Sequence, residues 1–282
     1  MTHEQWLRDG ATRLGAGPHP DRARRDAEAL LLHIVQRNRA SLLAHGKDEL
    51  DAAQAARYVA LIRRRLTGEP MQYIFGEAEF YGLPFRVTRD VLIPRPETEH
   101  LVEKALALAA PFAAPRIVDV GTGSGAIAVA LASRLPAAHV TAIDLSARAL
   151  DLAQENAELN GVADRIRFLP GDLLAPVDDE SFDIVVSNPP YVPTADRDSL
   201  AVEVRNYEPA QALFAGEDGL AVYKRLIPAA LAALVSGGSV ALEIGYGQAK
   251  AIRLLLTASG FDRIEFVADL QGIPRVACAR RP

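Results

Sequence analysis

The sequence predicts a doubly wound α/β fold: a mostly parallel sheet with an antiparallel last strand, preceded by a small N-terminal helical bundle and a β-hairpin linker. Toward the C-terminus, short β-branched runs alternate with longer amphipathic stretches, which is typical of βα units around a parallel sheet. Earlier in the chain, three stretches with helical spacing precede a segment rich in aromatic residues, glycine and proline. We therefore expect a helical domain at residues 1–70, a hairpin linker at 71–92 and an α/β domain at 93–282.

The bundle helices are expected at Glu4–Leu14, Asp21–Arg37 and Asp51–Leu66. The first residue of the second helix follows two prolines and is placed to cap it. Residues 1–75 carry a net charge of +3, whereas the rest of the chain carries −8. The densest basic run, Arg63–Arg65, occupies three adjacent helical positions that cannot form one face, so we expect a solvated helix end.

The segment from Gln72 to Arg89 alternates aromatic residues with glycine and proline, as in a hairpin, and its aromatic side chains are expected to pack between the domains. Seven strands are expected after it: Arg116–Val120, Val140–Ile143, Arg165–Leu169, Phe182–Ser187, Ser239–Ile244, Ile264–Val267 and Arg275–Ala279. The connection between the last two is too short for a crossover helix, so these two strands should be antiparallel.

Four residues, Asn188-Pro189-Pro190-Tyr191, directly follow the fourth expected strand and so lie at the edge where open α/β sheets bind ligands. Proline has no N–H, so Pro189 and Pro190 offer only carbonyl acceptors from a stiff backbone. Asn188 adds a side-chain carbonyl, and Tyr191 adds a flat aromatic face. This combination suits a planar NH₂ group of an amide or a nucleobase. We expect these four residues to hold a group of this kind as the substrate and to carry the catalysis.

A second binding signal is the turn Gly121-Thr122-Gly123-Ser124-Gly125, which lies between a strand and an apolar helix start. Glycines there let the backbone approach a ligand at the helix N-terminus. Asp119, inside the preceding strand, would repel a pyrophosphate but suits the ammonium group of an amino acid. The methionine end of S-adenosylmethionine carries such a group, so the segment predicts binding of that cofactor.

Two further acidic residues are placed at strand ends. Asp144 lies about 20 residues past the glycine turn, where a carboxylate commonly holds ribose hydroxyls. Asp172 follows the next strand and is placed to accept from an adenine amino group, while Leu173 packs on the adenine ring. A single strand-end aspartate is usually a helix cap, but acids at three successive strand ends, followed by Asn188, indicate one cofactor site.

Together, the glycine turn with its preceding aspartate and the Asn-Pro-Pro-Tyr motif resemble those of S-adenosylmethionine-dependent methyltransferases that modify amide or amino nitrogens. Four further stretches extend the resemblance over essentially the whole chain to the bacterial release factor glutamine methyltransferase family: Leu92–Glu99, Glu208–Leu213, Leu242–Gly245 and Gln248.

The resemblance implies cofactor contacts for Gly121–Gly125, Asp144, Leu173 and Asn188, and binding of an acceptor glutamine by Asn188–Tyr191. It also implies the partner, a class I peptide-chain release factor that is methylated on the glutamine of its Gly-Gly-Gln motif. One departure concerns the position after Asp172, which can be aromatic in relatives and is Leu173 here, so adenine need not be stacked on a ring.

Three other classes of protein remain to be weighed. An adenine methyltransferase acting on DNA or RNA shares the Asn-Pro-Pro-Tyr strand, but the acidic catalytic domain disfavours non-specific phosphate binding. A dinucleotide oxidoreductase is disfavoured by Asp119 and by the closing antiparallel pair. A non-catalytic binding module is disfavoured because the donor and acceptor signals are both intact.

Composition places the protein among cytoplasmic enzymes. Hydrophobic residues make up 49% of the chain, yet no uncharged apolar stretch approaches the roughly 20 residues of a membrane span. The N-terminus lacks the pattern of a secretory signal. The single Cys278 cannot form an internal disulfide and is expected in the core. No Cys/His cluster has metal-ligand spacing, so we expect no metal, and we expect neither a membrane nor a direct nucleic-acid partner.

Overall fold

The computed structural model describes residues 1–282, apart from the side chain of Leu43. Contacts divide the chain into two compact units. The helical unit comprises residues 1–76 and 200–207, and the catalytic unit comprises residues 77–199 and 208–282. The segment 200–207 carries no sequence signal that would assign it to the helical unit. The division expected from the sequence, at residues 70 and 92, stays a prediction.

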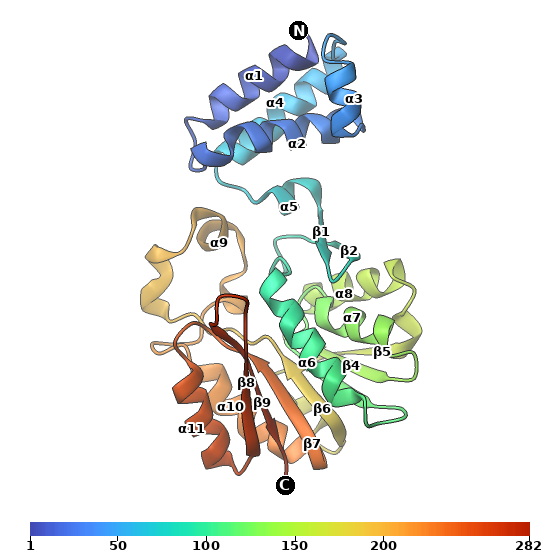
Figure 1. The fold of residues 1–282 in the computed structure, drawn as a ribbon, viewed down its shortest axis with the longest axis vertical. Helices are drawn as coiled ribbons and strands as arrows, with labels where there is room; N and C mark the ends of the chain where they lie inside the picture. Colours follow the sequence, from blue (N-terminus) through green and yellow to red (C-terminus); the bar gives the residue numbers. More distant parts are fainter. The chain divides into compact units, whose positions relative to one another are not determined.

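The helical unit contains α1 (His3–Leu14), α2 (Ala23–Val35), α3 (Arg39–Ala44), α4 (Ala52–Leu66), α5 (Met71–Phe75) and α9 (Val202–Tyr207) (Figure 1). Capping boxes at Thr2 and Asp51 begin α1 and α4. Asp21 does not cap α2, because it lies in a 3₁₀ turn that Pro20 begins. None of the helices of the described chain is both long enough and apolar enough to cross a bilayer.

The expectation of a solvated helix end at Arg63–Arg65 is wrong for one of the three arginines. Arg65 is 2% exposed, and its guanidinium donates to Asp26 Oδ2 at 2.6 Å and to Glu203 Oε1 at 2.5 Å. Successive helical positions point about 100° apart. One of three adjacent side chains therefore faces the interior of the unit, and there it needs buried carboxylate partners.

The catalytic unit is built on a seven-stranded sheet with the order β5-β4-β3-β6-β7-β9-β8. Its strands are β3 (Arg116–Val120), β4 (His139–Asp144), β5 (Ile166–Pro170), β6 (Phe182–Ser187), β7 (Leu234–Glu243), β8 (Asp262–Ala268) and β9 (Pro274–Arg280). Strands β3 to β7 are parallel to one another, and β9 is antiparallel to both of its neighbours. The predicted fold class, including the antiparallel last strand, is confirmed.

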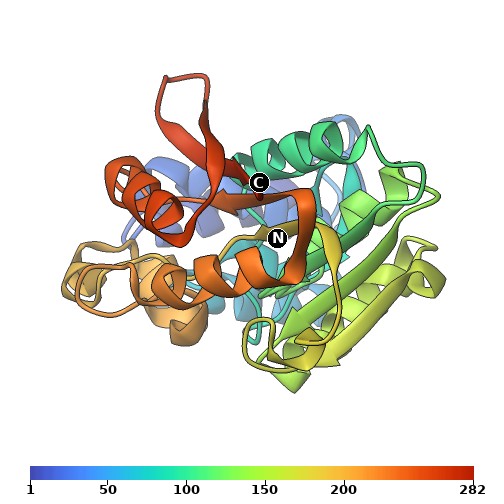
Figure 2. The ribbon, with the colours of Figure 1, turned by 90° about the horizontal axis from the view of Figure 1, so that it is seen from below.

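Helices cover both faces of this sheet. One face packs against α6 (Glu99–Ala109), α7 (Ala126–Arg134) and α8 (Ala147–Leu159), and the other packs against α10 (Ala221–Ala233) and α11 (Ala249–Ser259). Figure 2 shows α6 and α10 on opposite sides of the strands. All six residues of β6 are buried, as expected for an apolar run covered on both faces.

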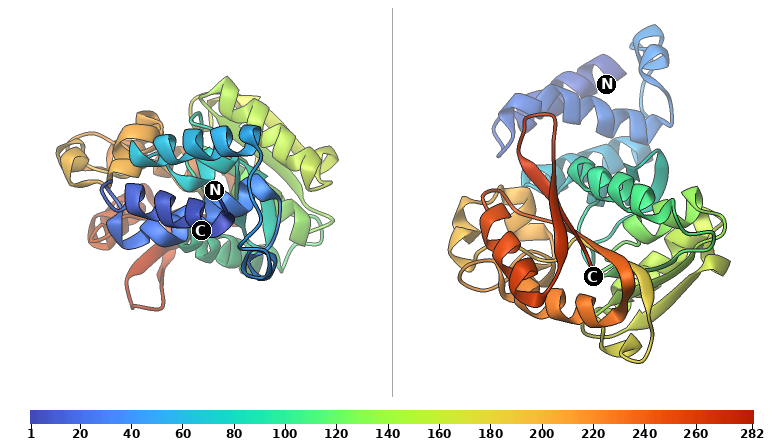
Figure 3. Two further views of the ribbon diagram at one scale, coloured as in Figure 1. Left: turned by 90° about the horizontal axis from the view of Figure 1, so that it is seen from above. Right: turned by 60° about the horizontal axis from the view of Figure 1, so that its bottom comes forward.

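A separate hairpin, β1 (Glu77–Phe80) and β2 (Leu83–Arg86), begins the catalytic unit. Phe80 and Phe85 are 2% and 1% exposed and belong to the core under α6 and α7, which corrects the expectation that they pack between domains. The views in Figure 3 show that the connection between β8 and β9 projects from this unit, with a fully exposed Leu270 near its tip.

The buried Arg65 contacts predict a large difference between neighbouring arginines. Arg65→Met leaves the buried Asp26 without its cation and removes the nearest cation from Glu203, so we expect the free energy of unfolding to fall by about 3–5 kcal/mol. Arg63, two residues earlier in α4 and exposed, is the matched control. Arg63→Ala should change stability by no more than about 0.5 kcal/mol. Urea unfolding of the full chain, followed by circular dichroism, measures both, and equal effects would contradict the buried pairing.

Candidate active site

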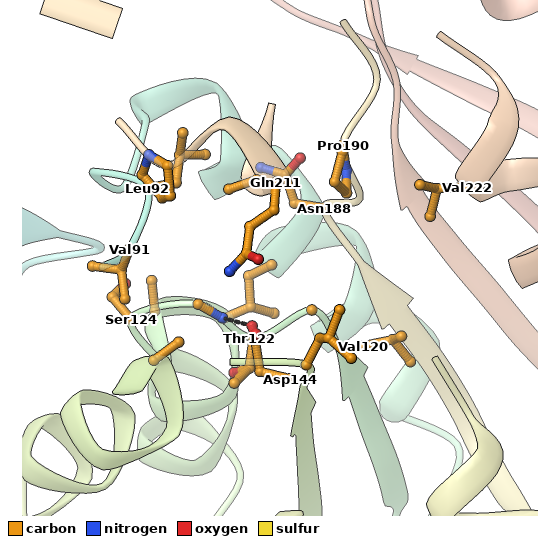
Figure 4. A pocket seen from close by; sticks show the side chains of 18 of the residues that line it. Val91, Leu92, Val120, Thr122, Ser124, Asp144, Asn188, Pro190, Gln211 and Val222 are labelled. Atoms are coloured by element: carbon orange, nitrogen blue, oxygen red, sulfur yellow. Dashed lines mark hydrogen bonds between the residues drawn. The ribbon is translucent and has the colours of Figure 1, made fainter. Parts of the chain in front are cut away.

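A cavity of about 260 Å³ opens at the carboxyl ends of β3, β4, β5 and β6. It is lined by Asp90, Val91, Leu92, Pro94, Arg95, Thr98, Val120, Gly121, Thr122, Gly123, Ser124, Ala126, Ile127, Asp144, Leu145, Ala149, Gly171, Asp172, Leu173, Asn188, Pro190, Pro209, Gln211, Ala212, Val222 and Arg225. Asn188 and the glycine turn thus share one cavity (Figure 4). The parallel strands deliver both to the same edge.

The turn after β3 is pinned to the neighbouring strand. The N–H groups of Gly121 and Thr122 both donate to the carbonyl of Ile143, at 2.8 and 3.0 Å. Gly121 and Gly123 have φ values of +74° and +56°, and a Cβ atom on either would meet nothing within 4 Å. Both residues line the cavity, so the bare backbone leaves room for a ligand to approach it.

Gly125 serves the packing of the turn instead. It does not line the cavity, and a Cβ atom there would stand 3.0 Å from Cβ of Ala153 on α8. A glycine at this position lets α7 start close to its neighbouring helix. The predicted cofactor contact of Gly125 therefore stays a prediction, while Gly121, Thr122, Gly123 and Ser124 are in the cavity wall.

Asp144 connects the turn with the helix that follows β4. Its Oδ2 accepts from the N–H of Gly123 at 2.8 Å, and its Oδ1 accepts from the N–H of Ser146 at 2.9 Å. A carboxylate has about four lone-pair positions, so each oxygen retains one for a ligand. Asp144 lines the cavity, and this arrangement fits the predicted role in holding two ribose hydroxyls.

Asp172 and Leu173 line the same cavity beyond β5. Asp172 is exposed and accepts a charge-assisted hydrogen bond from the guanidinium of Arg225 on α10. Leu173 has a φ of +54°, in the left-handed region that a leucine rarely adopts. Such strain persists where the surrounding structure enforces it, and here it places an apolar residue in the cavity wall. Packing of Leu173 on adenine stays a prediction.

Asp119 is placed differently from the other predicted cofactor residues. Its side chain is fully buried and is not part of the cavity wall. The hydroxyl of Thr122 donates to Oδ2 at 2.7 Å, and Oδ1 makes no hydrogen bond of ordinary geometry in the described part of the chain. Burial raises the pKa of Asp119 to about 7, against the opposing effects of Thr122 and the N–H of Ala128. The residue supports the turn from beneath, and contact with a cofactor ammonium stays a prediction.

The Asn-Pro-Pro-Tyr segment divides between the cavity and its support. Asn188 and Pro190 line the cavity, whereas Pro189 and Tyr191 do not. The hydroxyl of Tyr191 donates to Glu243 Oε1 at 3.4 Å, and its carbonyl accepts from Nε2 of Gln248 at 3.0 Å. Stacking of the Tyr191 ring on an acceptor therefore stays a prediction. Gln248, which the sequence marks only through the family resemblance, holds the backbone of the segment in place.

Two loops that the sequence did not assign to the site complete the cavity wall. They comprise residues 90–95 and residues 209–212. Nη2 of Arg95 in the first loop donates to both carboxylate oxygens of Glu208, the residue that precedes the second loop, at 2.6 and 2.7 Å. Figure 4 shows the side chain of Gln211 pointing into the cavity. Both loops fall in stretches that support the family resemblance, which was the available signal.

Among the described residues, no three His, Cys, Asp or Glu side chains gather closely enough to hold a metal ion. The polar side chains that line the cavity are carboxylates, amides, hydroxyls and guanidinium groups: Asp90, Asp144, Asp172, Asn188, Gln211, Thr98, Thr122, Ser124, Arg95 and Arg225. These groups suit an organic ligand with hydroxyl and amino groups.

Comparison with known proteins gives two family matches. Residues 98–216 match the methyltransferase small domain, and residues 5–76 match the PrmC N-terminal domain. A relative from Moorella thermoacetica is 45% identical over 282 residues, covering 100% of this chain and 99% of the relative. One from Koribacter versatilis is 42% identical over 283 residues, again covering 100% and 99%. Both are named release factor glutamine methyltransferase.

A solved structure of the hMettl16 catalytic domain, in complex with an RNA hairpin, superposes with a TM-score of 0.58. It covers 81% of both chains at 18% sequence identity. At this identity the similarity supports the fold alone.

The geometry at Asp144 predicts a strong effect on cofactor binding. Asp144→Ala removes the predicted charge-assisted hydrogen bonds to the ribose, each worth roughly 1.5–3 kcal/mol, and also frees the N–H of Gly123. We expect calorimetry to show S-adenosylmethionine binding at least about tenfold weaker, with Asp144→Asn intermediate and no binding of NAD. Asp151→Ala, at an exposed position on α8, is the control. Unchanged affinity in Asp144→Ala would remove this residue from the cofactor site.

Proposed function

This chain belongs to the release factor glutamine methyltransferase family, and we propose that it methylates the glutamine of the Gly-Gly-Gln motif in class I peptide-chain release factors. The methyl group comes from S-adenosylmethionine and goes to the side-chain nitrogen of that glutamine. The observation that carries the proposal is the shared cavity, in which the glycine turn, Asp144 and Asn188 lie together.

The donor side of the cavity is formed by groups from three strand ends. Gly121 and Gly123 leave their backbone open, Asp144 offers two free lone-pair positions, and Leu173 provides an apolar surface. S-adenosylmethionine, when bound, supplies a methyl group already activated by the sulfonium. The task left to the protein is to hold the acceptor nitrogen in line with that methyl group, and positioning of this kind is worth about 7–11 kcal/mol.

The residues on the acceptor side of the cavity must stabilise the attack of the glutamine amide nitrogen, which is a poor nucleophile. An amide nitrogen has its lone pair delocalised into the carbonyl, so it gains positive character and loses planarity as it attacks. The side-chain oxygen of Asn188, which lines the cavity, accepts one of its N–H groups and stabilises that developing charge. Pro189 does not line the cavity, so an acceptor role for its carbonyl stays a prediction. The proton leaves after methyl transfer, so the mechanism requires no dedicated base.

Selection of a release factor requires more than the pocket, because the Asn188–Tyr191 segment recognises only a flat amide. The glycines of a Gly-Gly-Gln loop let it enter a narrow cavity without side-chain clashes. We assign recognition of the rest of the factor to the helical unit, whose residues 1–75 carry a net charge of +3. Such docking weakens as salt screens the charges. The proposed reaction is cytoplasmic and involves no direct contact with nucleic acid.

Loss of the Asn188 acceptor should reduce turnover without abolishing cofactor binding. Asn188→Ala removes one charge-stabilising group, so we expect kcat to fall by about 10²–10³. Single-turnover assays at saturating S-adenosylmethionine measure this directly, and a thermal melt verifies that the fold survives. Near-normal turnover in Asn188→Ala would contradict the assigned mechanism.

The substrate is tested by locating the transferred label. Labelled S-adenosylmethionine is added with the protein to a cell extract, which is then divided between protease and nuclease digestion. We expect protease-sensitive label, and mass spectrometry should find one added methyl group on the Gly-Gly-Gln glutamine of a release factor. A factor with asparagine at that position is the control substrate. Nuclease-sensitive label would instead identify an adenine methyltransferase.

A further inference from the structure

A chain of hydrogen bonds runs from the acceptor site into the protein interior. Nδ2 of Asn188 donates to Oγ1 of Thr98 at 3.2 Å, and Oγ1 of Thr98 lies 2.6 Å from Oε2 of Glu243. Thr98 immediately precedes α6, and Glu243 is the last residue of β7. Thr98 and Glu243 are 4% and 3% exposed, so water does not compete for these bonds.

Thr98 has a single hydroxyl hydrogen, and this determines which atoms donate and which accept in these hydrogen bonds. A hydroxyl has one hydrogen to donate, and an ionised carboxylate only accepts. With Glu243 ionised, Thr98 must donate to Glu243, and its lone pairs are then left for the NH₂ group of Asn188. The amide of Asn188 therefore directs its nitrogen toward Thr98, and its oxygen points away from Thr98 and can accept a hydrogen bond from a ligand.

The surroundings of Glu243 come from several elements. Tyr191 donates to its carboxylate from the Asn-Pro-Pro-Tyr segment, and the hydroxyl of Tyr223 on α10 donates to its backbone carbonyl at 2.6 Å. Burial raises the pKa of Glu243 to about 7, and the charge of Glu97 adds to this effect. The hydrogen bonds from Thr98 and Tyr191 and the charge of Arg275 on β9 oppose it.

We propose that Thr98 and Glu243 are positioning residues, which hold the amide of Asn188 with its oxygen toward the substrate nitrogen. This inference rests on the proposed function and names what aligns its acceptor group. A protonated Glu243 reverses the pattern, because its O–H donates to Thr98 and the threonine hydrogen then turns to Oδ1 of Asn188. The NH₂ group of Asn188 would then face the N–H groups of the substrate amide, and two sets of donors would oppose each other.

Substitutions at Thr98 distinguish the effect of its hydroxyl on the orientation of Asn188 from the effect of its side-chain packing. Thr98→Val keeps the shape but removes the hydroxyl, so we expect kcat to fall about tenfold, with the KM values for cofactor and substrate within about threefold of wild type. Thr98→Ser retains the hydroxyl and should restore most of kcat. Thr257→Val, exposed on α11, is the matched control. Equal kcat in the valine and serine variants, or a loss confined to KM, would overturn the proposal.

The charge on Glu243 gives a second readout. The wild-type kcat should decline as the pH falls through about 7, since Glu243 then takes up a proton. In Glu243→Gln no proton is exchanged, so kcat should be lower at alkaline pH and nearly constant from about pH 6 to about pH 8. An unaltered acid limb in this variant would contradict control of Asn188 by Glu243.

A measurement on the full chain without substrate distinguishes this inference from the proposed function. The side-chain ¹⁵NH₂ signal of Asn188, identified by its loss in Asn188→Ala, reports the bond to Thr98. We expect slow hydrogen exchange in wild type and in Thr98→Ser, and at least about tenfold faster exchange in Thr98→Val. Equal exchange in all three proteins would overturn the proposal, whatever substrate the enzyme methylates. If the exchange rates differ as expected but the release factor is not methylated, only the proposed function fails.

Discussion

The register of the parallel strands is the constraint on which the site depends. Val120 at the end of β3 pairs with Ile143 in β4, and Asp119 pairs with Val186 in β6. These pairings bring the glycine turn, Asp144 and Asn188 to the same level of the sheet edge. The hydroxyl of Ser187 also donates to the carbonyl of Val120 at 2.6 Å, which ties the donor and acceptor strands at their ends. A shift of one residue would turn every side chain to the other face and separate the two halves of the cavity.

Two carboxyl groups are buried beneath the site, and burial of their charged forms lowers the stability of the fold. Asp119 and Glu243 lie under the donor and acceptor sides, and burial raises the pKa of each to about 7. A carboxyl group whose pKa is raised in the folded state favours the fold while it is protonated. The stability that these two groups contribute is present at acidic pH and is lost as the pH rises through about 7. The charged form of Glu243 that orients Asn188 is thus the form that stabilises the fold less. Functional sites commonly accept such a penalty.

The sequence was sufficient for elements whose signal is local. The strands Arg116–Val120 and Phe182–Ser187 were predicted with the observed bounds, because each is a short β-branched run with clear end signals. The short helices α3 and α5 were missed, since five or six residues give too few turns for a periodic pattern. The buried position of Arg65 was also missed, because its partner Glu203 is remote in the sequence.

The same distinction applies within the site. The glycine turn, Asp144 and Asn188 could be found because each directly follows an apolar strand, and a strand end has a known position in a parallel sheet. Thr98 and Glu243 could not be paired from the sequence, since 145 positions separate them. Each lies in a stretch that carries the family resemblance, but nothing in either stretch indicates the other as its partner. What joins them is the packing of α6 across the sheet onto β7. Side chains that line the cavity can thus be predicted from strand ends, whereas the buried groups that hold them in place are found only in the tertiary structure.

An asparagine that recognises an amide has a particular difficulty, because its own side chain is also an amide. Its two ends are nearly equal in shape and opposite in polarity, so packing alone cannot choose between them. Only a neighbour with fixed polarity can do so, and a threonine becomes such a neighbour when an ionised carboxylate takes its single hydrogen. The adjoining prolines avoid the problem, since they have no donor to misplace. The stiff Pro-Pro backbone and the Thr98–Glu243 pair therefore solve the same problem for a backbone and for a side-chain acceptor.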